Sequence, residues 1–231
     1  YEIHERLVGS EMCIRDSHPS LKPSLFRKGK NTEKATERIS QLIQRFVNDT
    51  YMQKELKIVP GDFETSKCKI EGMLQHYGVP TRFIDVVDNH WIALWMGLNK
   101  TEKPKQYNQY YHYTERSIPL VELAKGDPVS DELLFQYVLL IAVPFSNSRT
   151  FTGIQSSADY IEVDLRQALP STFLRPHAQH GLVLRRKVHH PTDYGTDAYD
   201  MAPAVIGIIK IRIDKVHELS LIHISEPTRR S

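Results

Sequence analysis

The stretch QHYGVPTRFIDVVDNHWIALWMG, from Gln75 to Gly97, decides the fold of this chain. Gly78 permits the left-handed backbone that ends a helix, and Pro80 pushes the residue before it into an extended conformation. The apolar run HWIALWMGL follows, and the Asn89 side chain can cap it as a buried helix. The chain is therefore predicted to turn sharply between two helices, with a short polar stretch in the turn.

The polar stretch contains the side chains with the clearest chemistry, which are Gln75, His76, Thr81, Arg82 and Asp85. Because apolar sequence flanks them, they are either satisfied within the protein or aimed at a ligand. In the simpler interpretation, Arg82 and Asp85 form a local ion pair that braces the turn, and His76 closes the helix by bonding a terminal carbonyl. Both interpretations, brace and ligand site, stay open.

Outward from the turn, the pattern changes from helices to strands. Residues 32–48 form an amphipathic pattern and residues 64–77 a second helix, whereas residues 100–131 are polar and tyrosine-rich, which predicts a long loop. Strand patterns then follow at residues 136–143, 160–165, 181–188 and 204–213. N-terminal helices followed by a mostly antiparallel sheet predict an α+β fold in a single domain.

Both ends of the chain resemble a translated sequencing-library adapter. LVGSEMCIRDS, Leu7 to Ser17, and LSLIHISEPTR, Leu219 to Arg229, match complementary strands of one adapter. We therefore expect residues 1–17 and 219–231 to be adapter-derived, non-native and packed outside the core. Residues 18–218 are then expected to be a metagenomic gene fragment.

Composition excludes several classes of protein. The chain has 30 Lys and Arg against 28 Asp and Glu among 231 residues, so a formal net charge of +2 gives no specific nucleic-acid signal. No apolar run approaches the roughly 20 residues that cross a bilayer, so no membrane contact is predicted. Cys13 lies in an adapter-like end, which leaves Cys68 without a disulfide partner. A cytoplasmic location is expected.

Three motifs resemble the FRG domain family, in that family's order. The turn stretch is similar to the family motif Q-H-x-G-x-P-T-R-L-L-D. LKPSLFR, at residues 21–27, is similar to the motif L-x-P-S-L-x-R, and LRPHAQHGLVL, at residues 174–184, is similar to R-x-x-A-Q-x-G-x-F. Departures such as Phe83 and Ile84 are apolar exchanges that a core absorbs by repacking. The aromatic-Arg-Gly motif of the family would precede LKPSLFR, where this chain has adapter-like sequence. Residues 18–218 are therefore predicted to be an N-terminally truncated FRG-like domain.

The resemblance implies a bacterial or phage-associated module whose reaction is not defined, and two hypotheses follow. In the first, the domain is an effector that uses NAD or another nucleotide, with an activity like that of ADP-ribosyltransferases. Arg82 or Arg175 would hold the phosphates, His76 would orient the ribose, and Glu162 would stabilise the cation that develops as nicotinamide leaves. In the second, it is a non-catalytic sensor, for example in phage defence, that binds a nucleotide or, through tyrosine-rich residues 107–116, a protein partner.

A basic segment completes the predicted ligand site. Between Asp164 and Asp193 the sequence has no acidic residue, and its arginines could receive a pyrophosphate, although one strand face could simply be solvated. We expect the turn residues to converge across one cleft with Arg175, His177 and Gln179. The histidines of this segment lack paired cysteines and an acidic ligand cluster, so no metal site is predicted.

Overall fold

The structure is a computed structural model, and it describes most of the chain. The described residues are 3–8, 20–27, 32–58, 63–102, 112–118, 134–144, 149–151, 153–178, 181–188 and 196–213. Within these ranges, no helix is long and apolar enough to cross a membrane.

Three helices precede the turn stretch, namely α1 (Thr32–Asn48), α2 (Thr50–Glu55) and α3 (Phe63–His76). The predictions for α1 and α3 are confirmed to within one residue at each end. The unpredicted α2 follows α1 directly because Asp49 caps it, accepting a hydrogen bond from Met52 N at 2.8 Å. α3 ends next to Gly78, whose φ of 85° is the predicted left-handed conformation.

Five strands form the sheet that carries the site, in the order β2-β9-β8-β7-β6. Their bounds are β2 Ile84–Val86, β6 Arg149–Phe151, β7 Ile154–Ser156, β8 Tyr160–Asp164 and β9 Leu182–Arg186. Each neighbouring pair is antiparallel. Two short helices, α7 (Leu165–Ala168) and α8 (Leu174–Ala178), lie between β8 and β9 in the chain.

A second antiparallel sheet has the order β1-β5-β10, with β1 at Ile3–Val8, β5 at Phe135–Pro144 and β10 at Val205–Arg212. β3 (Asn99–Glu102) and β4 (His112–Glu115) form a separate antiparallel hairpin. Single 3-10 turns occupy Ser24–Phe26 (η1), Thr196–Tyr199 (η2) and Ala202–Ala204 (η3). The predicted α+β fold in one domain is confirmed.

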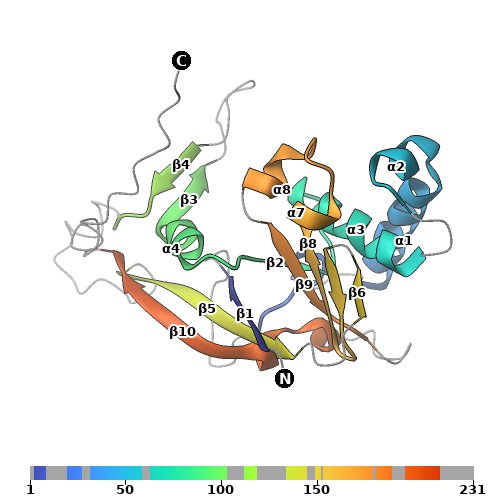
Figure 1. The fold of residues 1–231 in the computed structure, drawn as a ribbon. Coiled ribbons are helices and arrows are strands. Elements are labelled where there is room, and N and C mark those ends of the chain that lie inside the picture. Colours follow the sequence, from blue (N-terminus) through green and yellow to red (C-terminus); the bar gives the residue numbers. More distant parts are fainter. Residues whose placement is uncertain are drawn as a thin grey trace, which may run out of the picture.

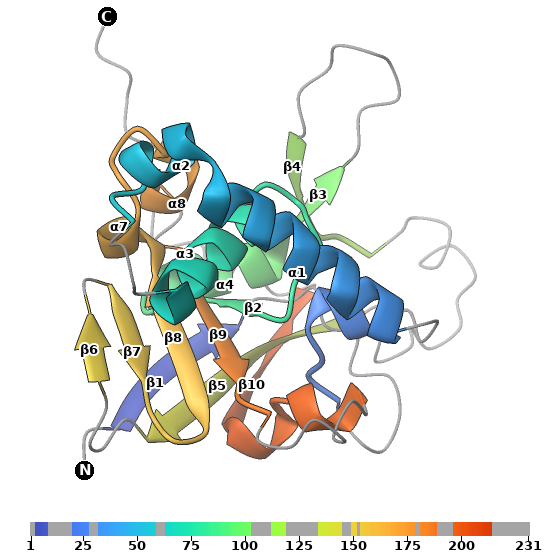
Figure 2. The same cartoon turned by 90° about the vertical axis from the view of Figure 1, so that its right-hand side faces the viewer.

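The elements stack in layers that share two main hydrophobic clusters. α1 and α3 cover one face of the five-stranded sheet, as Figures 1 and 2 show from two sides, and a core with Ile43, Ile70 and Val183 fills this interface. The opposite face of that sheet packs on the three-stranded sheet through a cluster that includes Leu184 and Ile141. The five-stranded sheet is therefore buried on both faces, which fixes its register against slippage.

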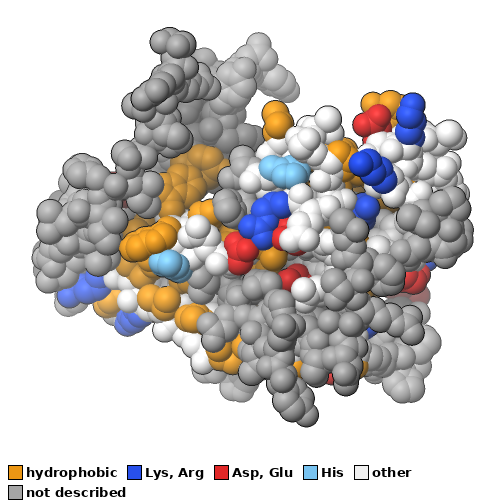
Figure 3. Space-filling view, in the orientation of Figure 1, with side chains coloured by type: hydrophobic (Ala, Val, Ile, Leu, Met, Phe, Trp, Pro, Cys, Tyr) orange, Lys and Arg blue, Asp and Glu red, His pale blue; other side chains and the backbone are white. Residues whose placement is uncertain are grey.

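α4 (His90–Leu98) packs on β5 and begins as predicted, because Asn89 Oδ1 accepts a hydrogen bond from Trp91 N at 2.9 Å. The prediction that this helix is buried is wrong for one side. Trp91 and Trp95 remain 43% and 41% exposed, and hydrophobic side chains are visible over α4 in Figure 3. Ala93 and Gly97 are buried against the sheet and their neighbours are partly buried, since α4 contacts one layer rather than lying between two.

Two further expectations need correction. Residues 100–131 were expected to form a loop, but the β3–β4 hairpin occupies part of this stretch, and residues 103–111 and 119–133 lie outside the described residues. Residues 3–8 were expected outside the fold, but they form β1 on the edge of β5. Backbone pairing needs only an extended segment, whatever its side chains, so this pairing does not bear on the adapter-like origin. Residues 219–231 lie outside the described residues.

Candidate functional site

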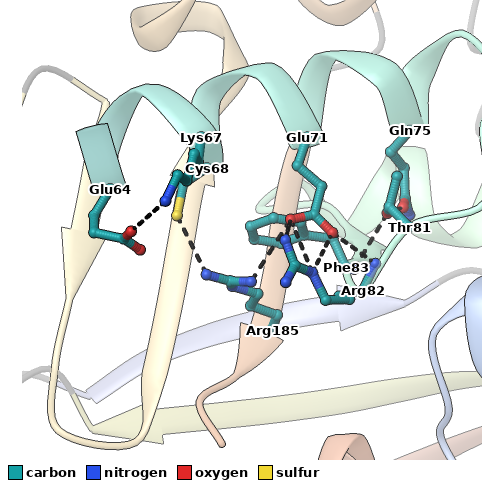
Figure 4. A network of polar contacts seen from close by, with 9 residues as sticks. All are labelled: Glu64, Lys67, Cys68, Glu71, Gln75, Thr81, Arg82, Phe83 and Arg185. Carbon is teal, nitrogen blue, oxygen red and sulfur yellow. Dashed lines mark hydrogen bonds and ion pairs between the residues drawn. The ribbon is translucent and has the colours of Figure 1, made fainter. Parts of the chain in front are cut away.

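The site begins with a row of polar side chains along one face of α3. Glu64, Cys68, Glu71 and Gln75 follow one another at spacings of three or four residues, which places them on one side of a helix. Figure 4 shows that this side faces β9 and residues 81–83, the segment that leads into β2. Apart from Glu64, whose side chain is 81% exposed, these polar groups are enclosed between a helix and a sheet, where each needs a partner.

Glu71 is the centre of the row, and its side chain is fully buried. Arg82 holds both carboxylate oxygens. Its Nη2 donates to Oε2 at 2.6 Å, its Nε donates to Oε1 at 2.9 Å, and its backbone N also donates to Oε1 at 2.9 Å. This bidentate geometry is the strongest form of ion pair available to arginine, and it ties α3 to the turn stretch.

A second arginine reaches the same carboxylate from β9. Arg185 Nη1 lies 3.6 Å from Glu71 Oε2, and Arg185 Nη2 donates to Cys68 Sγ at 3.4 Å. The guanidinium also lies over the Phe83 ring, with its carbon 5.1 Å from the ring centroid, a cation–π contact. Nε of Arg185 is buried and has no hydrogen-bond partner among the described residues.

The charges in this cluster do not balance. Burial opposes ionisation of Glu71, yet the hydrogen bonds and charge of Arg82 and the charge of Arg185 outweigh it and hold the pKa of Glu71 below its ordinary value. Burial raises the pKa of the Cys68 thiol, so this group is neutral. One carboxylate therefore faces two guanidinium groups, and the cluster of Glu71, Arg82 and Arg185 carries one excess positive charge.

Thr81 and Gln75 connect this cluster to the start of the chain. The Thr81 hydroxyl donates to Gln75 Oε1 and accepts from Phe83 N at 3.2 Å. The Thr81 backbone donates to Ser24 Oγ at 3.2 Å and accepts from Leu25 N at 3.2 Å. Both side chains thus have protein partners, as the structural alternative predicts for the turn residues.

His76 and Asp85 lie at the end of α3. His76 Nδ1 is 3.6 Å from Asp85 Oδ1, with the imidazole almost fully buried and the carboxylate 63% exposed. A Cβ added to Gly181 would lie 2.4 Å from His76 Nε2, so the imidazole packs directly on this glycine. The predicted Arg82–Asp85 brace is wrong, because the long arginine side chain turns back to α3 while Asp85 points to His76.

The predicted partners in the later segment are only partly placed. α8 contains Arg175 and His177 and contacts α3, and Gly181 N donates to Pro176 O at 2.9 Å, which brings this segment beside His76. His177 Nε2 is buried without a hydrogen-bond partner among the described residues. The Arg175 side chain and Gln179 lie outside what the structure describes.

Glu162 does not share this site. It is buried in β8 directly opposite Leu184, and residues paired in this way share a face of the sheet. Leu184 belongs to the core between the two sheets, whereas its neighbours Val183 and Arg185 point to α3. The sheet therefore separates Glu162 from Arg82 and His76, because successive side chains of a strand alternate between faces.

The sequence reasoning missed two residues of the cluster. Glu71 is not singled out within the helix predicted at residues 64–77, and Arg185 is considered only as one of the arginines of the basic segment. A signal for Glu71 does exist in its position within IEGML, where a carboxylate interrupts an apolar run and needs a cation. Among the described residues, no group of three or more His, Cys, Asp or Glu side chains could hold a metal ion.

The fold and the cluster define a class of protein, a small α+β domain in which a buried carboxylate joins two arginines between a helix and an antiparallel sheet. Residues 14–106 match the family model of the FRG domain, and this match confirms the predicted resemblance. The match includes the turn stretch and LKPSLFR, whereas LRPHAQHGLVL lies beyond it. No curated protein and no solved structure matched the chain.

Proposed function

We propose that this FRG domain binds a nucleotide, with NAD as the first ligand to test, and that Arg185 and Arg82 contact its phosphates. The excess positive charge of the Glu71 cluster carries this proposal. Arg185 and Arg82 share the single carboxylate of Glu71, so one of the two charges is not neutralised, and a phosphate would supply both the missing charge and hydrogen-bond acceptors.

Arg185 is the better phosphate ligand of the two arginines. Nε and Nη2 of Arg82 donate hydrogen bonds to the Glu71 carboxylate, at 2.6 to 3.1 Å. Arg185 approaches Glu71 only at 3.6 Å and keeps a buried Nε without an acceptor among the described residues. Its side chain is 13% exposed, so a ligand can reach part of it. Arg82 then contributes mainly charge and holds the turn in place.

The pair of His76 and Asp85 favours a second function, consumption of the bound nucleotide. An exposed carboxylate beside an imidazole could stabilise positive charge that develops as nicotinamide leaves NAD. In that reaction Asp85 would take the role that the sequence suggested for Glu162, since Asp85 lies on the α3 side of the sheet and Glu162 does not. Without turnover, the domain would be the nucleotide sensor of the alternative hypothesis.

The test of binding uses Arg185→Ala, with Arg186→Ala as the matched control. Arg186 is the next residue of β9 and is half-buried, but it pairs with Tyr160 and points to the other face. NAD affinity is measured by isothermal titration calorimetry on the full chain. Loss of one charge-assisted phosphate contact should weaken binding by roughly ten- to a hundredfold for Arg185→Ala and leave Arg186→Ala close to the parent.

Two results would contradict the proposal. Equal affinities of the Arg185→Ala variant and the parent would remove Arg185 from the site, and absence of nucleotide binding by the parent would remove the function. Consumption is tested separately by release of nicotinamide from NAD. Asp85→Asn should abolish release and preserve binding, whereas release that persists in this variant would exclude the carboxylate from the reaction.

A further inference from the structure

We infer that Tyr199 forms the surface on which the aromatic base of the ligand stacks, so that the site takes a nucleotide rather than any phosphate compound. The inference rests on the proposed nucleotide binding at Arg82 and Arg185. It adds a residue far from the turn stretch and assigns to it the part of the ligand that the arginines do not contact.

The first observation is a pair of stacked rings. Phe26, at the end of η1, and Tyr199, at the end of η2, lie with their ring centroids 4.3 Å apart and an interplanar angle of 21°. Phe26 is buried, with 3% of its surface exposed, whereas Tyr199 is only partly buried. Phe26 therefore supports the tyrosine ring from the inside and holds it in a fixed plane.

The second observation is that three distant segments meet beside the turn stretch. Leu25 N donates to Thr81 O at 3.2 Å, which places the residue before Phe26 next to the residue before Arg82. Met201 N donates to Leu21 O at 3.0 Å, and Asp200 Oδ1 accepts from Leu21 N at 2.7 Å. These bonds fix the segment that carries Tyr199 against the segment that carries Phe26, and the latter against the turn stretch beside Arg82.

The third observation is electrostatic. Burial disfavours the charged form of Arg82, but the hydrogen bonds and charge of Glu71 raise its pKa, and Tyr199 adds a smaller contribution in the same direction. The phenol therefore lies within electrostatic range of the Arg82 guanidinium. η2 also contacts β9, the strand of Arg185.

A supported aromatic ring beside a cationic cluster fits a ligand with both a planar base and a phosphate group. Stacking of a base on an aromatic side chain contributes roughly 1–3 kcal/mol, which corresponds to about a five- to a hundredfold gain in affinity. Pyrophosphate carries the charge of a nucleotide without the base. Because pyrophosphate also lacks the ribose, the contribution of Tyr199 is the change in the ratio of the two affinities when its ring is removed.

The experiment measures the affinities of ADP and pyrophosphate for the full chain and for two variants by calorimetry. Tyr199→Leu removes the ring but keeps apolar contact with Phe26, and Tyr199→Phe keeps the ring. The parent and Tyr199→Phe should bind ADP about five- to a hundredfold more tightly than pyrophosphate. In Tyr199→Leu this ratio should fall by about five- to a hundredfold while pyrophosphate affinity stays unchanged. Tyr51→Leu, at an exposed tyrosine on α2, is the control and should change neither affinity.

The outcomes separate this inference from the proposed function. If pyrophosphate and ADP bind the parent equally and Tyr199→Leu changes nothing, the base subsite is overturned and phosphate binding stands. If neither compound binds the parent, both proposals fail. Saturation-transfer NMR gives a second readout should Tyr199→Leu not fold. In the parent, the adenine protons of ADP should receive more saturation than the ribose protons, and the reverse order would overturn the inference.

Discussion

Replacement of Glu71 by alanine should destabilise the domain more than replacement of an exposed charged residue by alanine. The substitution removes the acceptor of four hydrogen bonds from Arg82 and leaves two guanidinium groups, 18% and 13% exposed, without their shared carboxylate. Removal of one partner of a buried ion pair costs about 3–5 kcal/mol, and in a domain of this size that corresponds to a melting temperature lower by roughly 6–20 °C.

The assay is thermal unfolding followed by circular dichroism at neutral pH. Glu64→Ala is the matched control on the same helix face, because its ion pair with Lys67 at 2.8 Å involves a carboxylate that is 81% exposed. Such a pair contributes about 0–1 kcal/mol, so the control should melt within a few degrees of the parent. A Glu71→Ala variant that melts within about 2 °C of the Glu64→Ala variant would refute the argument from burial.

Three further perturbations test other parts of the structure. Because the pKa of Glu71 is lowered in the fold, its ionised carboxylate stabilises the domain above the unfolded pKa of about 4.3, and this stabilisation is lost as pH falls through the folded pKa. The urea midpoint of the parent should therefore drop more between about pH 6 and pH 3 than that of Glu71→Gln, and equal drops would contradict this. Gly153→Ala should lower the free energy of unfolding by about 3 kcal/mol or more, since the new Cβ would lie 2.5 Å from a backbone nitrogen at a φ of 71°. Gly78→Ala, at a φ of 85° but with open space around the new Cβ, should lower it by only about 1–2 kcal/mol in urea unfolding. Similar losses in the two variants would show that the close contact at Gly153 is unimportant. Gly181→Ala should cost about 1–3 kcal/mol, and a double-mutant cycle with His76→Ala should recover part of this cost; strictly additive effects would show that the new methyl group does not meet the imidazole.

Much of the fold could be predicted from local patterns. α1 was predicted because its apolar side chains recur with the period of a helix, whereas β5 and β9 were recognisable as short runs of apolar residues, VLLIAV and LVL. β2 was missed because three residues are too few to show a period, and the β3–β4 hairpin because NKTE and HYTE are polar throughout. The burial of α4 was overestimated, since composition alone does not show how many layers a helix contacts.

The site was predicted less completely than the fold. Arg82, His76 and Asp85 stood out because Gly78 and Pro80 place them in a turn, but their partners could not be inferred from the turn. Arg82 bonds Glu71, in the helix that precedes the turn, and Arg185 approaches the same carboxylate from a strand that comes much later in the chain. Such pairings depend on the packing of α3 on β9, which no local period encodes. Glu162 was chosen for its charge alone, and the alternation of β8 places it on the other face.

The place of β5 between β1 and β10 affects how the chain can fold on the ribosome. β5 bonds one neighbour from the beginning of the described chain and another from its end, so the three-stranded sheet closes only after β10 has been synthesised. The helices and β2 emerge before β10, and the apolar side chains of α3 stay uncovered until β8 and β9 have been synthesised. Such distant pairings slow folding and expose apolar surface meanwhile. We expect chaperones to engage the nascent chain until β10 is released.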